Sequence, residues 1–367
     1  MATADPLRVA LVGGPMYDHL YAGFPLGTVE VVVHADHPTL NRRVADMLRA
    51  GERIDVLATH SKYAPSQAQW LQPLEALIDQ AALAELAPRA VDLCRFDGAL
   101  LCAPRLIDVR ILWYWRERVA RAAATPPDSW AELVESEVRF GFPGRESGLF
   151  GTFFELVVGN GGELFDASGG PTITSDEAEH AIETLRALAS RAPADLPDWH
   201  YDEVDRALLD GRVDAAGVWP GGYGPIRDRA RGAIAPAPYP AGSKRRVSYA
   251  GCHGWAIPTT CADVPRAVAF VHALIGREAQ ARDAAGGSMC AHPDALAAVQ
   301  PDDAIDEARL AITRSTIAEA MITYPPHPRF PEIEDAGWSA IRIAIRGEST
   351  ARSALEAVQA VAERVLA

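Results

Sequence analysis

The chain has 367 residues, of which 49% are apolar and 23% charged, a composition typical of globular proteins and not of disordered or fibrous ones. A single hydrophobic core rarely serves more than about 250 residues, so we expect two domains. The formal charge of −14 comes from 35 Lys and Arg against 49 Asp and Glu, which leaves no basic face for phosphate backbones and disfavours nucleic acid as a partner.

The sequence shows no apolar run near the roughly 18 residues that a membrane span needs. Residues 1–6 lack the charged and apolar regions of a secretory signal peptide. We therefore expect a periplasmic or extracellular, membrane-associated protein if a signal was trimmed, and a cytoplasmic one if Met1 is the native start. The cysteines are odd in number and show no CxxC spacing, so we expect mostly buried thiols and neither a disulfide framework nor a zinc site; they are Cys94, Cys102, Cys252, Cys261 and Cys290.

The first third of the chain alternates strand, helix and strand patterns. Apolar residues recur at helical spacing between residues 37 and 51, and short apolar runs flank this segment. The alternation predicts an α/β domain with a largely parallel sheet. The elements that we expect are strands at 7–14, 29–33 and 54–58, helices over about 73–90, and a strand at 98–104.

A second α/β segment follows an apolar stretch at residues 109–114. Asp128 or Ser129 is placed to cap a helix, and Ser175 to cap another. Proline and glycine are dense over 235–242, which predicts an exposed linker or hinge. The second segment continues through Phe140-Gly141-Phe142, and the other elements that we expect are helices at 150–158 and 175–192, strands at 213–219 and 254–258, and helices at 264–284 and 350–365.

A set of short motifs recurs in a fixed order along nearly the whole chain: Asp55-Val56, WLQPL at 70–74, the run 98–115, TPPDSWAEL at 125–133, GNGG at 159–162, LDGRVDAA at 209–216, PAPYP at 236–240 and GWAI at 254–257. In this order and spacing they resemble the family 1 extracellular solute-binding proteins. That family includes the maltose- and other sugar-binding components of bacterial ABC importers.

The resemblance implies an α/β, two-lobed, periplasmic-binding-protein-like fold of type II, with hinge strands and an interlobe cleft that closes on the ligand. We expect residues 1–106 and 250–300 to form the first lobe and residues 107–249 and 301–367 the second. The implied function is delivery of a small polar ligand, a sugar or sugar derivative, to the membrane subunits of an ABC importer. The resemblance implies a monomer and no enzyme, cofactor or metal.

Loops that follow predicted strands supply the candidate ligand contacts of the first lobe. The Gly13-Gly14 pair lets a ligand approach the backbone closely or forms an ordinary tight turn, and GGPMYD lacks the nucleotide-binding glycine patterns. Asp108 stands where the maltose-binding relatives carry a ligand-contacting carboxylate; its alternative is a hinge ion pair with Arg105 or Arg110. The candidates are Gly14, Tyr17, Thr59, His60, Ser61, Arg105, Asp108, Gly251, His253 and Trp255.

Aromatic and arginine residues make up most of the second-lobe candidates. Trp338 matches a tryptophan that stacks on sugar in the maltose-binding relatives, although core packing is its alternative, and Trp219 or Tyr223 is our best single candidate. Arginines at loop positions raise the alternative of an anionic ligand such as a sugar acid, or are solvated surface residues. The candidates are Arg145, Ser147, Trp219, Gly221, Tyr223, Arg329 and Trp338.

Two departures from these relatives qualify the ligand. The stacking aromatic residue after the Asp55-Val56 strand is replaced by the Thr59 region, and the Lys- and Asp-rich first loop is absent. We therefore expect a smaller or differently charged ligand than a long maltodextrin. The alternatives are a cytosolic ligand-sensing or regulatory protein and a binder of a non-sugar organic acid. Adjacent Cys252 and His253 could also indicate thiol catalysis, but the sequence secures no base or orienting partner, and we expect no catalytic residue.

Overall fold

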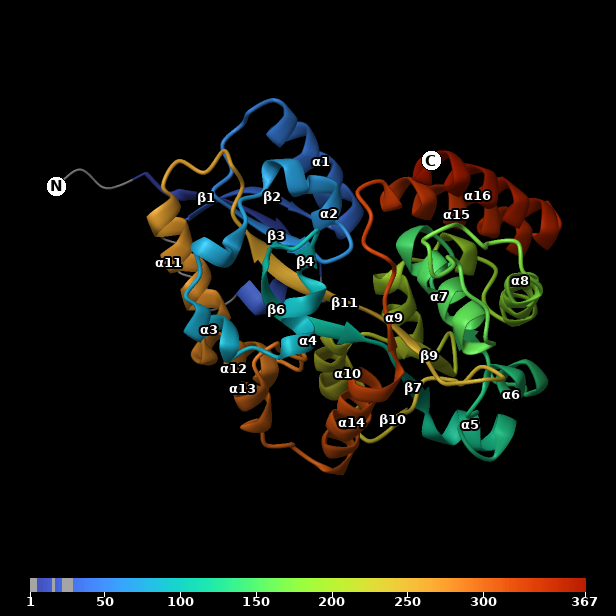
Figure 1. Cartoon of the computed structure of the whole chain (residues 1–367). Coiled ribbons are helices and arrows are strands. Elements are labelled where there is room, and N and C mark those ends of the chain that lie inside the picture. Colours follow the sequence, from blue (N-terminus) through green and yellow to red (C-terminus); the bar gives the residue numbers. More distant parts are fainter. Residues whose placement is uncertain (1–4, 15–16, 22–28) are drawn as a thin grey trace. The chain divides into compact units, whose positions relative to one another are not determined.

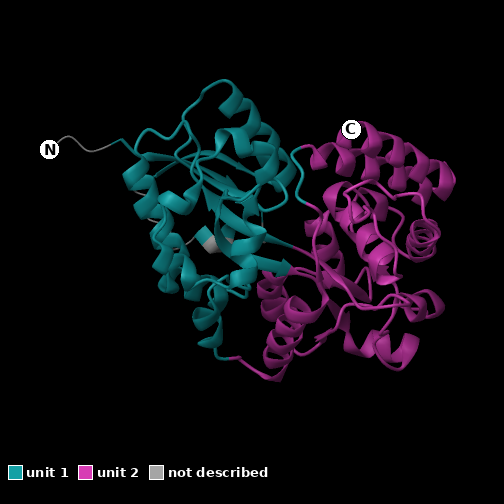
Figure 2. Ribbon diagram, in the orientation of Figure 1, with its two compact units in different colours: residues 1–108, 251–300, 326–328 teal, residues 109–250, 301–325, 329–367 magenta. Residues whose placement is uncertain are grey.

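The computed structural model describes residues 5–14, 17–21 and 29–367 (Figure 1). The chain divides into two compact units, which Figure 2 shows in different colours. Each is assembled from separate stretches of the chain, whereas the sequence led us to expect changes of lobe after residues 106, 249 and 300. Unit 1 comprises Met1–Asp108, Gly251–Gln300 and Pro326–Pro328; unit 2 comprises Val109–Ala250, Pro301–Pro325 and Arg329–Ala367.

Unit 1 is built on a sheet whose first three strands are parallel. Strand β1 (Leu7–Val12) lies between β2 (Val29–Ala35) and β3 (Val56–His60). Strand β11 (Ser248–Ala256) is antiparallel to β3, and β6 (Ala103–Val109) pairs with β11. Because β1, β2 and β3 are parallel, their carboxyl ends meet at one edge of the sheet, where ligands bind in open α/β sheets.

Helix α1 (His37–Arg49) packs on β1 and β2, and its start and buried face follow from its sequence. The Asp36 side chain accepts a hydrogen bond from the Thr39 amide at 2.8 Å, which caps the helix. Its buried residues, Leu40, Val44 and Leu48, are four apart and so lie on one face. The predicted helix is confirmed.

The other helices of unit 1 include the pair α11 and α12, orange in Figure 1, where one helix had been predicted. The two are separated by Gly276, whose extended backbone ends α11. The remaining elements of unit 1, with this pair, are η1 (Asp18–Tyr21), α2 (Ala64–Gln67), η3 (Ala68–Trp70), η4 (Leu74–Ala76), α3 (Gln80–Ala84), α4 (Pro88–Leu93), β4 (Arg95–Phe96), β5 (Ala99–Leu100), α11 (Val264–Ile275), α12 (Arg277–Ala285) and α13 (Pro293–Ala297).

Unit 2 contains a four-stranded sheet in the order β10-β7-β9-β8. Strand β7 (Ile111–Trp115) is antiparallel to both β9 (Ala215–Val218) and β10 (Ile234–Ala237), whereas β8 (Phe140–Gly141) is parallel to β9. Strand β12 (Met321–Ile322) pairs with the first residues of β11. Strands β8 and β9 therefore end at the edge of the sheet where β7 begins.

Helix α7 (Glu146–Gly159) is the central helix of unit 2, and its residues from Ser147 onward are buried. Helices α8 and α15 pack on it, and α16 packs on α15. Ser129 and Ser175 cap α6 and α8 as the sequence predicts. The other elements of unit 2 are α5 (Arg116–Ala123), α6 (Trp130–Glu135), α8 (Asp176–Ala189), η5 (Leu196–Asp198), α9 (Tyr201–Leu209), η6 (Pro220–Gly222), α10 (Tyr223–Ala230), α14 (Ala304–Ser315), η7 (Thr316–Ala320), α15 (Phe330–Ile345) and α16 (Ala351–Leu366).

The Pro- and Gly-rich segment 235–242 is not the exposed linker that its composition predicted. Its first residues belong to β10, in which Pro236 pairs with Trp113, and Tyr239 is almost completely buried. Strand β10 lies at the edge of the four-stranded sheet, where the missing N–H of a proline breaks no further ladder bond. The linker prediction is wrong because composition does not reveal an edge strand.

Four of the five cysteines are buried and Cys261 is half-buried, and all are free thiols, which confirms the prediction of mostly buried thiols. Within the ranges that the structure describes, no helix combines the length and apolar character needed to cross a membrane.

Candidate functional site

Three histidines gather at the carboxyl edge of the parallel strands in unit 1. His37 opens the helix after β2, His60 ends β3, and His253 lies opposite His60 on β11. The ring centroids of His37 and His253 are 4.7 Å apart, those of His60 and His253 5.0 Å, and those of His37 and His60 5.6 Å. Tyr17, from the loop after β1, lies 5.2 Å from His253 between ring centroids. The edge thus carries a compact polar cluster, called the histidine cluster below.

Polar contacts hold the His253 and His60 rings of the histidine cluster. Nε2 of His253 faces a carboxylate oxygen of Asp108, and Nδ1 of His60 accepts from the Lys62 amide at 3.0 Å. Burial lowers the pKa of His60 well below its usual range, and the nearby imidazoles of His253 and His37 lower it further. His60 is therefore neutral near pH 7. The cluster presents a carboxylate and imidazole nitrogens, which suit hydroxyl donors and acceptors.

The alternative for Asp108, a hinge ion pair with Arg105 or Arg110, is not what the structure shows, because Asp108 pairs with His253, Arg105 with Asp283 and Arg110 with Glu155. Arg105 donates through Nε to Asp283 at 3.0 Å, and its guanidinium lies 5.0 Å from the ring centre of Trp255. Arg105, Asp283 and Trp255 are all buried.

The remaining unit 1 candidates border the histidine cluster through the backbone. Ser61 and Cys252 exchange hydrogen bonds, and Thr59 approaches Gln67 at 3.4 Å between oxygens. A Cβ at Gly251 would lie 2.0 Å from Cε1 of His60, so only glycine lets this ring pack against β11. Gly14 adopts positive φ in the turn after β1, while Pro15 and Met16 lie outside the described residues.

Aromatic rings dominate the corresponding edge of unit 2. Trp219 follows β9 and makes edge contacts with Tyr201 at 5.8 Å and with Tyr249 at 6.1 Å between ring centroids. The hydroxyl oxygens of Ser147 and Tyr201 are 3.4 Å apart. The structure thus brings the predicted Trp219 and Ser147 together through Tyr201, which the sequence did not single out. Tyr324, whose ring contacts Tyr249, completes this group. The aromatic cluster of unit 2 consists of Ser147, Tyr201, Trp219, Tyr249 and Tyr324.

A buried ion pair lies next to Trp219 of the aromatic cluster. The Arg110 guanidinium donates to the Glu155 carboxylate on α7 and to the Thr152 hydroxyl at 3.0 Å. The same guanidinium lies 5.3 Å from the ring centre of Trp219. Both charged side chains are at most 1% exposed, so each depends on the other for compensation. The pair links the residue before β7 to the central helix α7, and the Arg110 guanidinium packs against the Trp219 ring.

Other unit 2 candidates lie apart from the aromatic cluster. Tyr223 stacks on Trp113, and the Arg309 guanidinium lies 4.1 Å from the centre of the Tyr223 ring. Burial raises the pKa of the Tyr223 hydroxyl to about 12. Arg145 lies at the start of α7 and pairs with Glu146 and Glu203.

Of the candidates Arg329 and Trp338, the first precedes α15 as its N-cap residue and the second lies within α15, and both make local hydrogen bonds. Arg329 bonds Glu332, and the Trp338 indole N–H donates to Asp335 at 3.2 Å. Gly221 lies in the turn η6 beside Trp219. None of these contacts joins Arg329 or Trp338 to the aromatic cluster.

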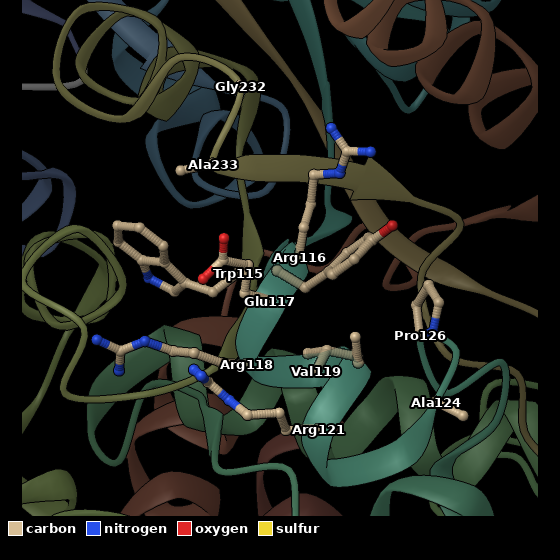
Figure 3. A pocket seen from close by; sticks show the side chains of 12 residues that line it. Trp115, Arg116, Glu117, Arg118, Val119, Arg121, Ala124, Pro126, Gly232 and Ala233 are labelled. Carbon is tan, nitrogen blue, oxygen red and sulfur yellow. The ribbon is translucent and has the colours of Figure 1, made fainter.

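A separate pocket of about 810 Å³ lies in unit 2, at the Trp115 end of β7 (Figure 3). Strand β7 begins at Ile111, opposite Val218, so this pocket and Trp219 lie at opposite ends of the strand. The Arg118 guanidinium is 5.2 Å from the ring centre of Trp115 and bonds the Gly211 carbonyl at 2.5 Å. None of the candidate ligand contacts from the sequence lines this pocket.

Sequence reasoning missed His37, Tyr201, Tyr249 and Tyr324. His37 had a usable signal, because it comes shortly after β2, as His60 comes at the end of β3. The three tyrosines had none, since they come from a helix start, from β11 and from the segment after β12. In the portion of the chain that is described, no group of His, Cys, Asp and Glu is arranged to hold a metal ion.

A known protein family matches more than half of the length of the chain. The family model described as "Bacterial extracellular solute-binding protein" matches residues 28–281. A curated relative from Sinorhizobium fredii, "Probable amino-acid ABC transporter periplasmic-binding protein y4oP", is 30% identical over 184 residues. That match spans 44% of this chain and 42% of the relative, so it covers less than half of the relative's length.

Solved structures of similar fold extend over nearly the whole chain. Maltose-bound MalE3 of T. maritima superposes with a TM-score of 0.90 at 20% identity, covering 98% of this chain and 100% of the other. A solute-binding protein of Thermotoga lettingae with α-D-tagatose gives 0.87 at 18% identity, covering 99% and 100%. One from Agrobacterium radiobacter K84 with ribitol gives 0.84 at 19% identity, covering 98% of each. These matches confirm the predicted α/β periplasmic-binding-protein fold.

Proposed function

Because the chain belongs to the bacterial extracellular solute-binding protein family, a family of binding proteins and not of enzymes, we propose that it captures a small polar solute for an ABC importer. The proposed location is outside the cytoplasmic membrane, where such an importer takes up its solute. The proposed solute is a neutral sugar or polyol. The proposed contacts are the histidine cluster with Asp108 in unit 1 and the aromatic cluster in unit 2.

The observation that carries the sugar assignment is the chemistry of these two clusters. Rings such as Trp219 suit the apolar C–H face of a sugar, and a carboxylate with imidazole nitrogens suits its hydroxyl groups. The proteins of similar fold that were solved with maltose, tagatose and ribitol bind compounds of this class. The arginines that suggested a sugar acid support it less, because Arg105 and Arg145 both have carboxylate partners.

An amino acid is the second candidate solute. It is favoured by the relative named as an amino-acid transporter component, which is 30% identical over the matched segment. The carboxylate of Asp108 could accept from the ammonium group of an amino acid.

A thermal-shift screen separates these candidates. The panel contains maltose, D-tagatose, ribitol, a sugar acid such as D-glucuronate, and the twenty amino acids. A solute that binds only the folded state stabilises it by RT ln(1 + [L]/Kd), about 2.7 kcal/mol at a hundredfold excess over Kd. We expect a concentration-dependent rise in Tm with a sugar or polyol, and loss of that rise in Trp219→Ala.

The matched control is Trp70→Ala, which removes a half-buried tryptophan from unit 1, away from both clusters. A rise only with amino acids would replace the sugar assignment by the second candidate. No rise with any compound in the panel would contradict the proposed solute classes.

A further inference from the structure

Tyr324 is a buried tyrosine of unit 2 that follows a π-helical turn, η7, and the short strand β12. Its ring packs closely on three others, with centroids 4.4 Å from Phe330, 4.6 Å from Phe154 and 4.6 Å from Tyr249. The residue is only 8% exposed, and its hydroxyl has no hydrogen-bond partner among the residues that the structure describes. The ring is therefore fixed while its polar atom is unmatched.

An unmatched buried hydroxyl is unfavourable, because desolvation is not repaid by a hydrogen bond. Phenylalanine would make the same ring contacts without that penalty. Burial also raises the pKa of Tyr324 well above its usual range, so the hydroxyl keeps its proton and remains a donor. The structure thus holds a donor that ring packing does not explain.

Trp219 repeats this feature in the same cluster. It too is 8% exposed, and no described residue accepts a hydrogen bond from its indole N–H. Tyr249 contacts both rings, so one continuous ring cluster carries both donors.

No described group accepts a hydrogen bond from the Tyr324 hydroxyl, although the carboxylates of Glu334 and Glu155 are close enough to act on its pKa. A Cβ placed on Gly151 of α7 would lie 3.7 Å from the Tyr324 oxygen and 3.8 Å from Nη2 of Arg110. The Glu155 carboxylate, the nearest acidic group on that helix, is engaged by Arg110 and by the Tyr249 amide at 2.7 Å. A bound solute with acceptor oxygens would supply the partner that the described residues do not give the Tyr324 hydroxyl.

We propose that Tyr324 is a solute-contacting residue and that its hydroxyl and the indole N–H of Trp219 donate to oxygen atoms of a polyhydroxylated solute. The inference rests on the proposed function, because it assigns a further residue to the solute site of unit 2. It also narrows the solute class, since two donors on an aromatic surface match a sugar or polyol with several acceptor oxygens.

Tyr324→Phe tests the proposal, with maltose, D-tagatose and ribitol as probes and with Tm and isothermal titration calorimetry as readouts. The Tm of the unliganded variant should equal or exceed that of the wild type, because an unmatched hydroxyl is removed. Its Kd for the probe that binds the wild type should rise about fivefold, as expected for one neutral hydrogen bond. Tyr114→Phe, on β7 at the separate pocket, is the matched control and should leave Kd unchanged.

Each contrary result has a distinct meaning. If Tyr324→Phe binds the probe as the wild type does, the inference is overturned while the proposed function stands. A lower Tm of the unliganded variant with unchanged Kd would assign the hydroxyl to folding and also overturn it. If no probe binds the wild type, the proposed solute class fails, and the inference fails with it.

Discussion

The two units present different chemistry at the edges where their strands end. In unit 1 three polar side chains at this edge have polar partners: His253 faces Asp108, His60 accepts from the Lys62 amide, and Arg105 donates to Asp283. In unit 2 the edge is aromatic, with one buried ion pair beneath it and two donors without partners among the described residues. The difference indicates that unit 1 offers an ordered polar surface, whereas unit 2 offers ring surfaces and unmatched donors.

The largest expected effect concerns the ion pair of unit 2. Glu155→Ala leaves the Arg110 charge buried without compensation, which should destabilise unit 2 by about 3–5 kcal/mol. Urea unfolding followed by the fluorescence of the unit 2 tryptophans measures the loss. Glu183→Ala is the matched control, because Glu183 pairs with Arg186 on the exposed face of α8 and should change stability by less than about 1 kcal/mol. A small effect of Glu155→Ala would mean that water compensates the Arg110 charge in the variant, or that Glu155 is already neutral in the wild type. Either result would weaken the contrast between the two units.

The next effect tests the polar surface of unit 1. Asp108→Asn removes a charged acceptor, and hydrogen bonds to charged groups are worth about 1.5–3 kcal/mol. We expect Kd for the solute found in the screen to rise roughly tenfold to a hundredfold. Titration calorimetry of the purified variant provides the value, and Asp46→Asn, on the exposed side of α1, is the control. Unchanged affinity would remove the histidine cluster and its carboxylate from the solute site.

The smallest effect is the pH dependence that His60 gives to unit 1. Because the folded pKa of His60 lies well below its usual value, the unfolded chain binds a proton near pH 6.5 and the folded chain does not. The contribution of neutral His60 to the free energy of unfolding is fully present above pH 6.5. It is lost as the pH falls from 6.5 towards the pKa of His60 in the folded state. One group gives a slope of at most about 1.4 kcal/mol per pH unit.

Denaturation of wild type and His60→Gln between pH 7.5 and 5 measures this slope. The substitution should flatten the acid limb, whereas His180→Gln, on the exposed side of α8, should not. Parallel curves for His60→Gln and the wild type would show that His60 takes up its proton in the folded state.

Much of the fold followed from local pattern. The Asp36 cap and the spacing of Leu40, Val44 and Leu48 suffice to predict α1, and Ser175 marks the start of α8. The segment 235–242 shows the limit, because an edge strand and an exposed linker share the same proline-rich composition. The helix predicted over 264–284 was divided at Gly276, although both parts are helical.

The candidate site was predictable only where a residue ends or follows a strand. His60 and Trp219 satisfy that rule, and His37 satisfies it too, although it was overlooked. Tyr249 and Tyr324 join the aromatic cluster through packing between segments that are far apart in the sequence. The partner of Asp108 was likewise decided by the pairing of β6 with β11, which no local pattern encodes.

By itself the sequence determined the α/β class, the starts of the main helices and the order of motifs that resembles the solute-binding family. These depend on periodicity, capping and spacing, which are local properties of the chain. Only the tertiary structure decided which charges are compensated and which donors are left unmatched, as with Arg110, Trp219 and Tyr324. The reason is physical: burial and hydrogen-bond satisfaction depend on neighbours from distant segments, and those neighbours exist only once the chain has folded.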